Sequence, residues 1–401
     1  MPTNEELVQK SITAADALAS AGKLNDAQAN KFIDYVFDLS VLKKVARIVR
    51  FRNENLDIDK IGVGSRVAMP ASEARDPGRR RGVSHSKITL TPKELMVPFE
   101  ISDTYREHNI EGDSAEDHIV RMMGTQAGND IEELYIDGDT VGPAAIESTI
   151  VDDGSDTEYI KDSYLALFDG WMRQADSGNL VDHAGAAVSS SLFGKMINAM
   201  PVKFRRNRAN LVFLCSMELE QLYRERVSTR ATAKGDDALN SEVPLTPFGV
   251  PLVGVPLMNF YQKVVHNITF TGSGSTVSLR YAPIKANSLV VTPTTLGDVP
   301  DEAYLLTTDY TVDETAGTVT HAGGGSAIGT SATVKATFEA FPQLLLTPRS
   351  NLIAAIGRDI RIEKDRDIFK RVNQYALTTK VDTKFEEVTA VVKGYNISNV
   401  L

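Results

Sequence analysis

Acidic clusters and histidines are the residues of this sequence that could perform chemistry. Four carboxylates lie close together after residue 150, namely Asp152, Asp153, Asp156 and Glu158. Carboxylate oxygens bind calcium, but the ligand spacing of a calcium-binding EF-hand loop is absent here. We therefore interpret this stretch as a solvated acidic turn. The alternative is a hydrolase that uses a metal bound by the acidic loop 152–158, which would lose turnover on Asp153→Ala.

The histidines give no stronger indication of a metal site. His108 and His118 lie near Glu111, Asp113 and Asp117, but none of the six histidines is paired at the spacing of a zinc site. The glycine-rich stretches 272–275 and 323–325 connect strand-like segments, whereas a phosphate cradle needs a helix N-terminus behind it. No nucleophile elbow, P-loop, zinc-protease or dinucleotide-binding motif occurs. We expect no catalytic residue, no cofactor and no metal, and hence no enzyme.

Two basic segments could contact polyanions or acidic partners. The first carries five basic residues without an acid between them: Lys43, Lys44, Arg47, Arg50 and Arg52. It predicts either a solvated basic face or a surface that contacts a polyanion such as packaged DNA. The second segment carries Arg75, Arg79, Arg80 and Arg81 among glycines and prolines. The flanking residues 55–61 and 87–101 alternate like strands, which predicts either a long two-stranded ribbon with a basic tip or a flexible surface loop.

Composition sets the limits for these interpretations. The 401 residues carry a net charge of −10, which argues against a nucleic-acid binder along its whole length. The single cysteine, Cys215, lies in an apolar run and cannot form an intrachain disulfide. No apolar run is long enough to span a membrane and no signal peptide is evident. We expect a soluble protein of two or three domains that stays in the cytoplasm where it is made.

The most strongly patterned element is a helix predicted over residues 114–136. Ser114 and Asp117 form an N-terminal capping pair. Apolar residues then recur three and four residues apart, at Ile119, Met122, Met123, Ala127, Ile131, Leu134 and Tyr135. Gly124 and Gly128 interrupt this stripe, which predicts either a close neighbour or a bend. The sequence 137–139 ends the helix.

The other elements are predicted with shorter patterns. Helices are expected over 164–175, 190–200 and 217–230, and a strand over 210–215. Residues 265–342 contain short strand-like runs between glycine-rich turns, which predicts a small inserted β-sandwich. Residues 358–385 are strand-like and strongly charged, and 390–397 predict a buried strand. The fold class is therefore α+β.

The order of these elements resembles that of the major capsid proteins of tailed bacteriophages with the Hong Kong 97-like fold. The segments that carry the resemblance are 66–87, 90–102, 131–139, 248–258, 344–367 and 390–397. The resemblance covers nearly the whole chain except 265–342, which is similar to immunoglobulin-like insertions of other phage structural proteins. The sequence departs from the type member in two respects: no motif identifies its cross-linking residues, and no long N-terminal scaffolding segment is found. The resemblance then implies either a separate scaffolding protein or a precursor cleaved before Met1.

The resemblance implies a division of the chain. It implies an N-terminal arm (1–54), an E-loop (55–102), a peripheral domain with a spine helix (103–155 and 358–385), an axial domain (156–264, 343–357 and 386–401) and the inserted β-sandwich (265–342). The implied product is an icosahedral shell of hexamers and pentamers in the virion, assembled in the host cytoplasm. Expected partners are other copies of the chain, a scaffolding protein, a portal, a decoration protein and packaged double-stranded DNA, but no membrane.

The resemblance also suggests a contact between subunits. The basic tip with Arg75, Arg79, Arg80 and Arg81 would pair with an acidic set of a neighbour: Glu363, Asp365 and Asp367. Two other structural roles stay open: an encapsulin-like compartment, which would hold cargo protein without DNA or a portal, and a phage tail sheath or tube protein, which would form long helical tubes.

Overall fold

The computed structural model describes residues 41–42, 45–51, 55–62, 68, 83–102, 114–140, 146–152, 156–161, 164–230, 244–293, 301–323, 326–329 and 331–398. Its longest feature is a sheet of four described strands in the order β1-β18-β19-β4. These strands are β1 (Arg47–Arg50), β18 (Leu352–Asp367), β19 (Val372–Phe385) and β4 (Lys93–Ser102). Strands β18 and β19 form a long antiparallel hairpin, β4 pairs with β19, and β1 runs parallel to β18 at the opposite edge.

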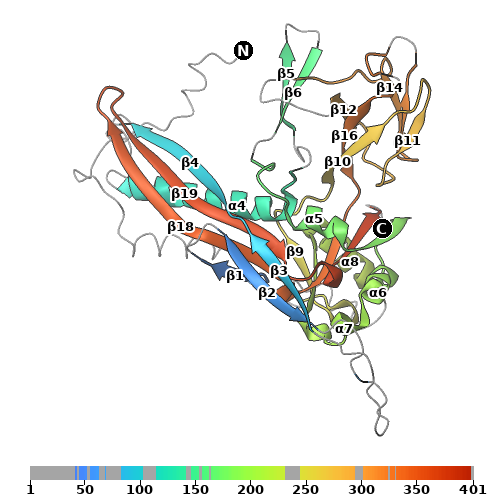
Figure 1. Ribbon diagram of the computed structural model, residues 1–401, viewed down its shortest axis with the longest axis horizontal. Coiled ribbons are helices and arrows are strands. Elements are labelled where there is room, and N and C mark those ends of the chain that lie inside the picture. Colours follow the sequence, from blue (N-terminus) through green and yellow to red (C-terminus); the bar gives the residue numbers. More distant parts are fainter. Residues whose placement is uncertain are drawn as a thin grey trace, which may run out of the picture.

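Helix α4 (Ser114–Asp137) runs along this sheet (Figure 1). Its first half packs Ile119 against Phe99, Ile362 and Tyr375, where Phe99 and Tyr375 stack with their ring centroids 4.9 Å apart. Its second half enters the main core. The predicted helix is therefore present. Gly124 and Gly128, the two glycines that interrupt the apolar stripe, are both buried.

A second sheet forms the base of the molecule, with the described strands in the order β7-β20-β17-β8-β9. The strands are β7 (Asn179–Ala186), β20 (Val392–Ile397), β17 (Leu344–Pro348), β8 (Leu211–Ser216) and β9 (Leu252–Val255). Side chains of β8 alternate between two hydrophobic cores: Val212 and Leu214 face one, and Phe213 and Cys215 face the other. This alternation explains why all the residues of β8 are buried.

Helices α6 (Ser190–Ala199) and α8 (Met217–Ser228) contribute to the second of these cores. Helix α8 is capped by the Ser216 hydroxyl, which accepts a hydrogen bond from the backbone N–H of Leu219. The remaining short elements are α7 (Val202–Arg205) and the 3-10 turns η3 (Arg208–Asn210), η4 (Pro247–Gly249), η5 (Arg349–Asn351) and η6 (Val388–Ala390). The strands predicted at 210–215 and 390–397 and the helices predicted at 190–200 and 217–230 are present within a few residues.

The segment predicted to be all-β forms two sheets that share a core, to which Phe270, Tyr281 and Phe338 contribute. One described sheet contains β10 (Gln262–Thr269), β16 (Thr333–Ala340) and β12 (Val290–Pro293). The other contains β11 (Thr276–Ser278), β15 (Thr318–His321) and β14 (Tyr310–Asp313). We call residues 262–340 the β-module. It lies at the upper right of Figure 1, above the second sheet and its helices.

Three sequence expectations need correction. The predicted ribbon strand 87–101 is divided: β3 (Ser84–Leu90) pairs with β2 (Leu56–Gly62), and β4 then joins the long sheet. The change of partner occurs at Thr91-Pro92, where Pro92 has no N–H to donate and the N–H of Thr91 donates to the Asp382 carboxylate at 2.7 Å.

The helix predicted over 164–175 is reduced to α5 (Trp171–Gln174) and the following 3-10 turn η2 (Ala175–Ser177). Gly170 is extended, with ψ of 176°, and its N–H donates to the carbonyl of Gly138 at 2.7 Å. The helix is interrupted because this pairing holds the backbone before Trp171 in an extended conformation.

The acidic stretch around residue 152 is expected from the sequence to be a turn. Its described residues instead belong to the two strands of a hairpin. Strands β5 (Ile146–Asp152) and β6 (Asp156–Lys161) pair with each other, and β13 (Asp301–Glu302) adds to β6. The ladder between these strands satisfies backbone hydrogen-bonding groups that a loop would leave to water. Asp153 lies outside the described residues.

Candidate assembly surfaces and the polar junction

The ribbon of β2 and β3 is the first extended surface of the molecule. Its strands pair from Leu56–Leu90 to Gly62–Ser84. Asp57 accepts hydrogen bonds across the ribbon from Thr89 at 2.6 Å and from Lys87 at 3.0 Å, and these contacts lower the pKa of Asp57. At the far end Ile61 is 69% exposed. The predicted basic tip, Arg75, Arg79, Arg80 and Arg81, lies outside the described residues.

Lys60 holds the ribbon to the body of the molecule. Its ammonium lies 3.1 Å from the Glu387 carboxylate and also donates to the Glu386 carbonyl. The hydroxyl of Thr389 and Lys60 lower the pKa of Glu387. Because Lys60 is on β2 and Glu387 follows β19, this contact fixes the direction in which the ribbon leaves the long sheet.

The β18–β19 hairpin is the second extended surface. Glu363, Asp365 and Asp367 are two residues apart on β18 and therefore share one face, as the predicted acidic set requires. Glu363 and Asp365 are exposed. Asp367 has a local role in addition, because its Oδ1 accepts the N–H groups of Phe369 and Lys370 at 2.9 and 3.1 Å. These hydrogen bonds hold the turn at the end of the hairpin.

The described part of the basic N-terminal run lies on β1. Arg47 and Arg50 are both exposed on this edge strand. Arg47 lies 3.5 Å from the Glu386 carboxylate and therefore forms an ion pair within its own chain. Lys43, Lys44 and Arg52 lie outside the described residues.

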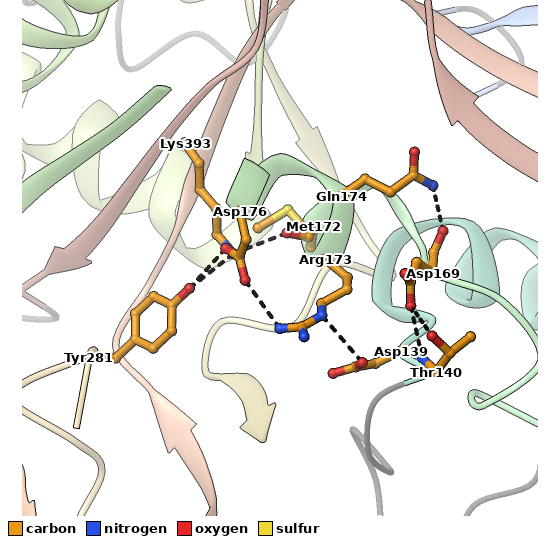
Figure 2. Close-up of polar contacts among 9 residues, drawn as sticks. All are labelled: Asp139, Thr140, Asp169, Met172, Arg173, Gln174, Asp176, Tyr281 and Lys393. Carbon is orange, nitrogen blue, oxygen red and sulfur yellow. Dashed lines mark hydrogen bonds and ion pairs between the residues drawn. The ribbon is translucent and has the colours of Figure 1, made fainter. Parts of the chain in front are cut away.

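A polar cluster lies behind these surfaces, where α4, α5, β20 and the β-module meet (Figure 2). The buried ammonium of Lys393 lies 2.8 Å from Oδ1 of Asp176 and 3.1 Å from the carbonyl of Met172. The hydroxyl of Tyr281, on the β-module, donates to the same Asp176 oxygen at 2.9 Å. We call Asp176, Lys393, Tyr281, Arg173 and Asp139 the polar junction.

Arg173 connects the two carboxylates of the polar junction. It lies 3.4 Å from Asp139 and 3.5 Å from Asp176 (Figure 2). Burial lowers the pKa of Lys393, and the charge of Asp176 opposes this shift. Burial alone would raise the pKa of Asp176, but the charge and hydrogen bond of Lys393 outweigh burial and leave it below its ordinary value. The buried charges are therefore paired.

Asp137 lies beside this cluster, at the end of α4. Its Oδ2 accepts a hydrogen bond from Asn259 at 3.2 Å, whereas its Oδ1 is enclosed without a hydrogen-bond partner among the described residues. Burial and the nearby charge of Glu133 raise the pKa of Asp137 to about 7. A small cavity here is also lined by Gln343, whose side-chain amide lacks a described partner.

Burial shifts the pKa of two groups that could act as a nucleophile or a base, Cys215 and His183. Burial raises the pKa of the Cys215 thiol well above its ordinary value. Burial and the charge of Lys195 lower the pKa of His183 to about 4. Among the described residues no group of His, Cys, Asp and Glu side chains is arranged to hold a metal ion. Within that same part of the chain no helix is long and apolar enough to cross a membrane.

The polar junction was missed by sequence reasoning. The sequence carries one sign of this cluster: Lys393 is a single charged residue inside strand β20, which is otherwise predicted to be buried. Its partners could not be found, because Asp176, Tyr281 and Lys393 are separated by 105 and 112 residues along the chain.

No protein-family model matches the sequence. Over 392 residues the chain is 28% identical to "Putative prophage capsid protein YqbE" of Bacillus subtilis (strain 168), and the match covers 97% of both chains. The chain is a homologue of this capsid protein. The match extends across the β-module as well as the two sheets of the body, so it includes the segment that the family resemblance did not cover.

The capsid homologue also has the fold of a phage procapsid chain. A chain in the structure of the satellite phage P4 procapsid, which includes the size determination (Sid) protein, superposes with a TM-score of 0.51. The identity is 11%, and the superposition covers 98% of this chain and 96% of the other. The mixed α+β architecture therefore matches that of a phage procapsid chain along almost its whole length.

Proposed function

We propose that this chain is the major capsid protein of a tailed phage or prophage. It self-assembles through hexamers and pentamers into an icosahedral shell that encloses double-stranded DNA. The observation that carries this proposal is the homology to a prophage capsid protein over 97% of both chains. The fold shared with a phage procapsid chain supports it independently, because that likeness rests on backbone geometry at low sequence identity.

The architecture supports the same proposal. A ribbon of two strands is only marginally stable by itself in water. The β2–β3 ribbon and the far end of the β18–β19 hairpin expose hydrophobic side chains, including Ile61, Ile368 and Phe369. Neighbouring copies in a shell would cover such elements through heterologous contacts. In this proposal 55–102 is the E-loop, α4 is the spine helix, and the second sheet belongs to the axial domain.

The further divisions follow the same assignment. The peripheral domain comprises 103–155 and 358–385, the N-terminal arm comprises 1–54, and the β-module is an immunoglobulin-like insertion on the shell surface. The basic N-terminal run faces the genome. A scaffolding protein, a portal and a decoration protein are the expected partners, and the shell is assembled in the host cytoplasm before it becomes the virion.

The proposed pairing of the basic ribbon tip with the hairpin of a neighbour gives a first mutational test. Reversal of Arg79, Arg80 and Arg81 to Glu should give soluble subunits that do not form shells, because the tip would then repel Glu363 and Asp365. Each exposed pair contributes only about 0–1 kcal/mol, but the contact repeats throughout a shell. Assembly is measured by sedimentation and negative-stain microscopy. Normal particles from the triple variant would contradict the pairing.

The proposed function itself is tested by microscopy of the purified protein. Closed shells, or rings with the mass of a hexamer, are the expected result, alone or with the scaffolding protein coexpressed. Native particles should contain DNA and a portal vertex, whereas a cargo protein without DNA would identify an encapsulin-like compartment. A protein that stays monomeric in both conditions would refute the capsid function.

A further inference from the structure

The end of the β18–β19 hairpin carries two adjacent hydrophobic side chains in water. Ile368 is 75% exposed and Phe369 is 100% exposed. The turn that presents them is constrained, because Asp367 accepts two backbone N–H groups and Arg371 has a positive φ of 57°. Single exposed hydrophobic residues are common, but an aromatic residue held at the end of a long projecting hairpin is an arrangement that suits binding.

A groove of complementary character lies between β4 and α4. It encloses about 320 Å³ and is lined mainly by apolar side chains, among them Leu95, Met96, Ala127, Ile131, Leu167 and Leu377. This volume lies at the lower end of the range for ligand pockets, about 300–1,000 Å³. Met96 at its edge is 63% exposed. The groove is therefore an open apolar surface that a small hydrophobic anchor could fill.

The charges at the two places are also complementary. The exposed Lys370 and Arg371 follow directly after Phe369. Asp130 lines the groove, and its Oδ1 accepts a hydrogen bond from the neutral side chain of Gln126 at 2.7 Å. Glu94 also lines the groove, but Arg358 and Lys380 already pair with it. Asp130 is thus the carboxylate best placed to receive a cation from the hairpin end.

The hairpin end cannot reach the groove of its own chain. Strand β19 begins at Val372, which pairs with Ser102, whereas the groove lies beside Thr378, which pairs with Met96. Six residues of strand separate these positions by roughly 20 Å. The hairpin end at the upper left of Figure 1 projects beyond the sheet and away from α4. A contact between the two must therefore join different copies.

We propose that Ile368 and Phe369 of one copy dock into the groove between β4 and α4 of a second copy, with Lys370 or Arg371 beside Asp130. The inference rests on the proposed function, since it names a contact by which the shell would be built. The contact is heterologous: each copy offers one hairpin end and one groove, so it can be repeated from subunit to subunit.

The first test compares assembly of two matched variants. Phe369→Asp should reduce the yield of sedimenting shells by roughly thirty-fold or more, the effect of losing one aromatic anchor at an interface. Val202→Asp is the control, because Val202 is 68% exposed on α7 and outside the groove. Trp171 fluorescence shows whether each subunit is folded. Equal assembly of the Phe369→Asp and wild-type proteins would overturn the inference and leave the capsid function intact.

The second test locates the contact by cross-linking. The native Cys215 is buried, so introduced cysteines can be modified selectively. Differently tagged Phe369→Cys and Met96→Cys copies are mixed, assembled and treated with a short bis-maleimide. A product that joins the two tags supports the inference. Products that join only two Phe369→Cys copies, or only two Met96→Cys copies, would show another arrangement of the subunits and overturn it. Failure of the wild-type protein to assemble would count against the proposed function instead.

A charge exchange separates docking from a general loss of solubility. Asp130→Lys should weaken assembly, because it would place a cation beside Lys370 and Arg371. Adding Lys370→Glu and Arg371→Glu to that variant should restore shells. Absence of any restoration, with all variants folded, would overturn the assigned partner of Asp130.

Discussion

Removal of the Lys393 charge is the sharpest test of how the β-module is held to the body. Lys393→Met keeps the length and apolar stem of the side chain but leaves Asp176 buried with Tyr281 and Arg173 as its described partners. The ion pair is 2.8 Å long, and the side chains of Lys393 and Asp176 are 4% and 14% exposed. Loss of one partner of a buried pair destabilises a protein by about 3–5 kcal/mol, because the remaining charge stays desolvated.

The assay can report on this junction directly. Trp171 is the single tryptophan, is 1% exposed and precedes Met172, whose carbonyl accepts a hydrogen bond from Lys393. Urea unfolding of the subunit followed by tryptophan fluorescence should show a midpoint lowered by roughly 1–1.7 M, for a denaturant dependence of about 3 kcal/mol per M. Lys393→Arg keeps the charge and is the matched control.

A double variant distinguishes an unpaired charge from lost packing. Lys393→Met with Asp176→Asn removes both charges, and the amide oxygen still accepts from Tyr281. The double variant should be at least about 1–2 kcal/mol more stable than Lys393→Met, because contacting residues are coupled by energies of this size. If Lys393→Met alone costs less than about 1 kcal/mol, or if the double variant is no more stable than Lys393→Met, the electrostatic account of the polar junction is wrong.

Two further predictions concern the end of α4. Burial and the charge of Glu133 raise the pKa of Asp137 to about 7. The folded state therefore holds the Asp137 proton more tightly than the unfolded state does. The free energy of unfolding should fall by up to about 4 kcal/mol as the pH rises from 4 to 7. Asp137→Asn should remove most of this fall in urea titrations at several pH values, and an unchanged profile would refute the assignment. Gly138→Ala should destabilise the subunit by more than about 1 kcal/mol in the same assay, because a Cβ would lie 2.4 Å from the Phe168 carbonyl oxygen; Gly272→Ala, where no atom lies within 4 Å of the added Cβ, is the control.

Local patterns in the sequence predicted the elements whose own residues determine them. The helix α4 follows from its apolar period, and β8 follows from a short apolar run before a serine cap. The β-module strands follow from alternating residues between glycine-rich turns. Each of these signals lies within a few residues of the structure that it specifies.

The features that sequence reasoning missed depend on distant partners. The interruption before α5 requires the Gly138 carbonyl, and the division of the ribbon strand requires the Asp382 carboxylate. The polar junction joins α5, β20 and the β-module, which no local pattern relates. The groove between β4 and α4 likewise arises only where β4 pairs with β19 beside α4. Pairing over such separations cannot be read from hydrophobic period or turn chemistry.

The position of β20 has a consequence for synthesis of the protein. This strand ends at Ile397 and lies between β7 and β17 in the interior of its sheet. Strands β18 and β19 similarly lie between β1 and β4, which precede them by some 250 residues or more in the chain. Neither sheet can be completed until β18, β19 and β20 have left the ribosome. At about 5–20 residues per second, a nascent chain would spend tens of seconds without its final fold. Chains that stop before β18 would therefore lack both the β18–β19 hairpin and the groove that β19 helps to line.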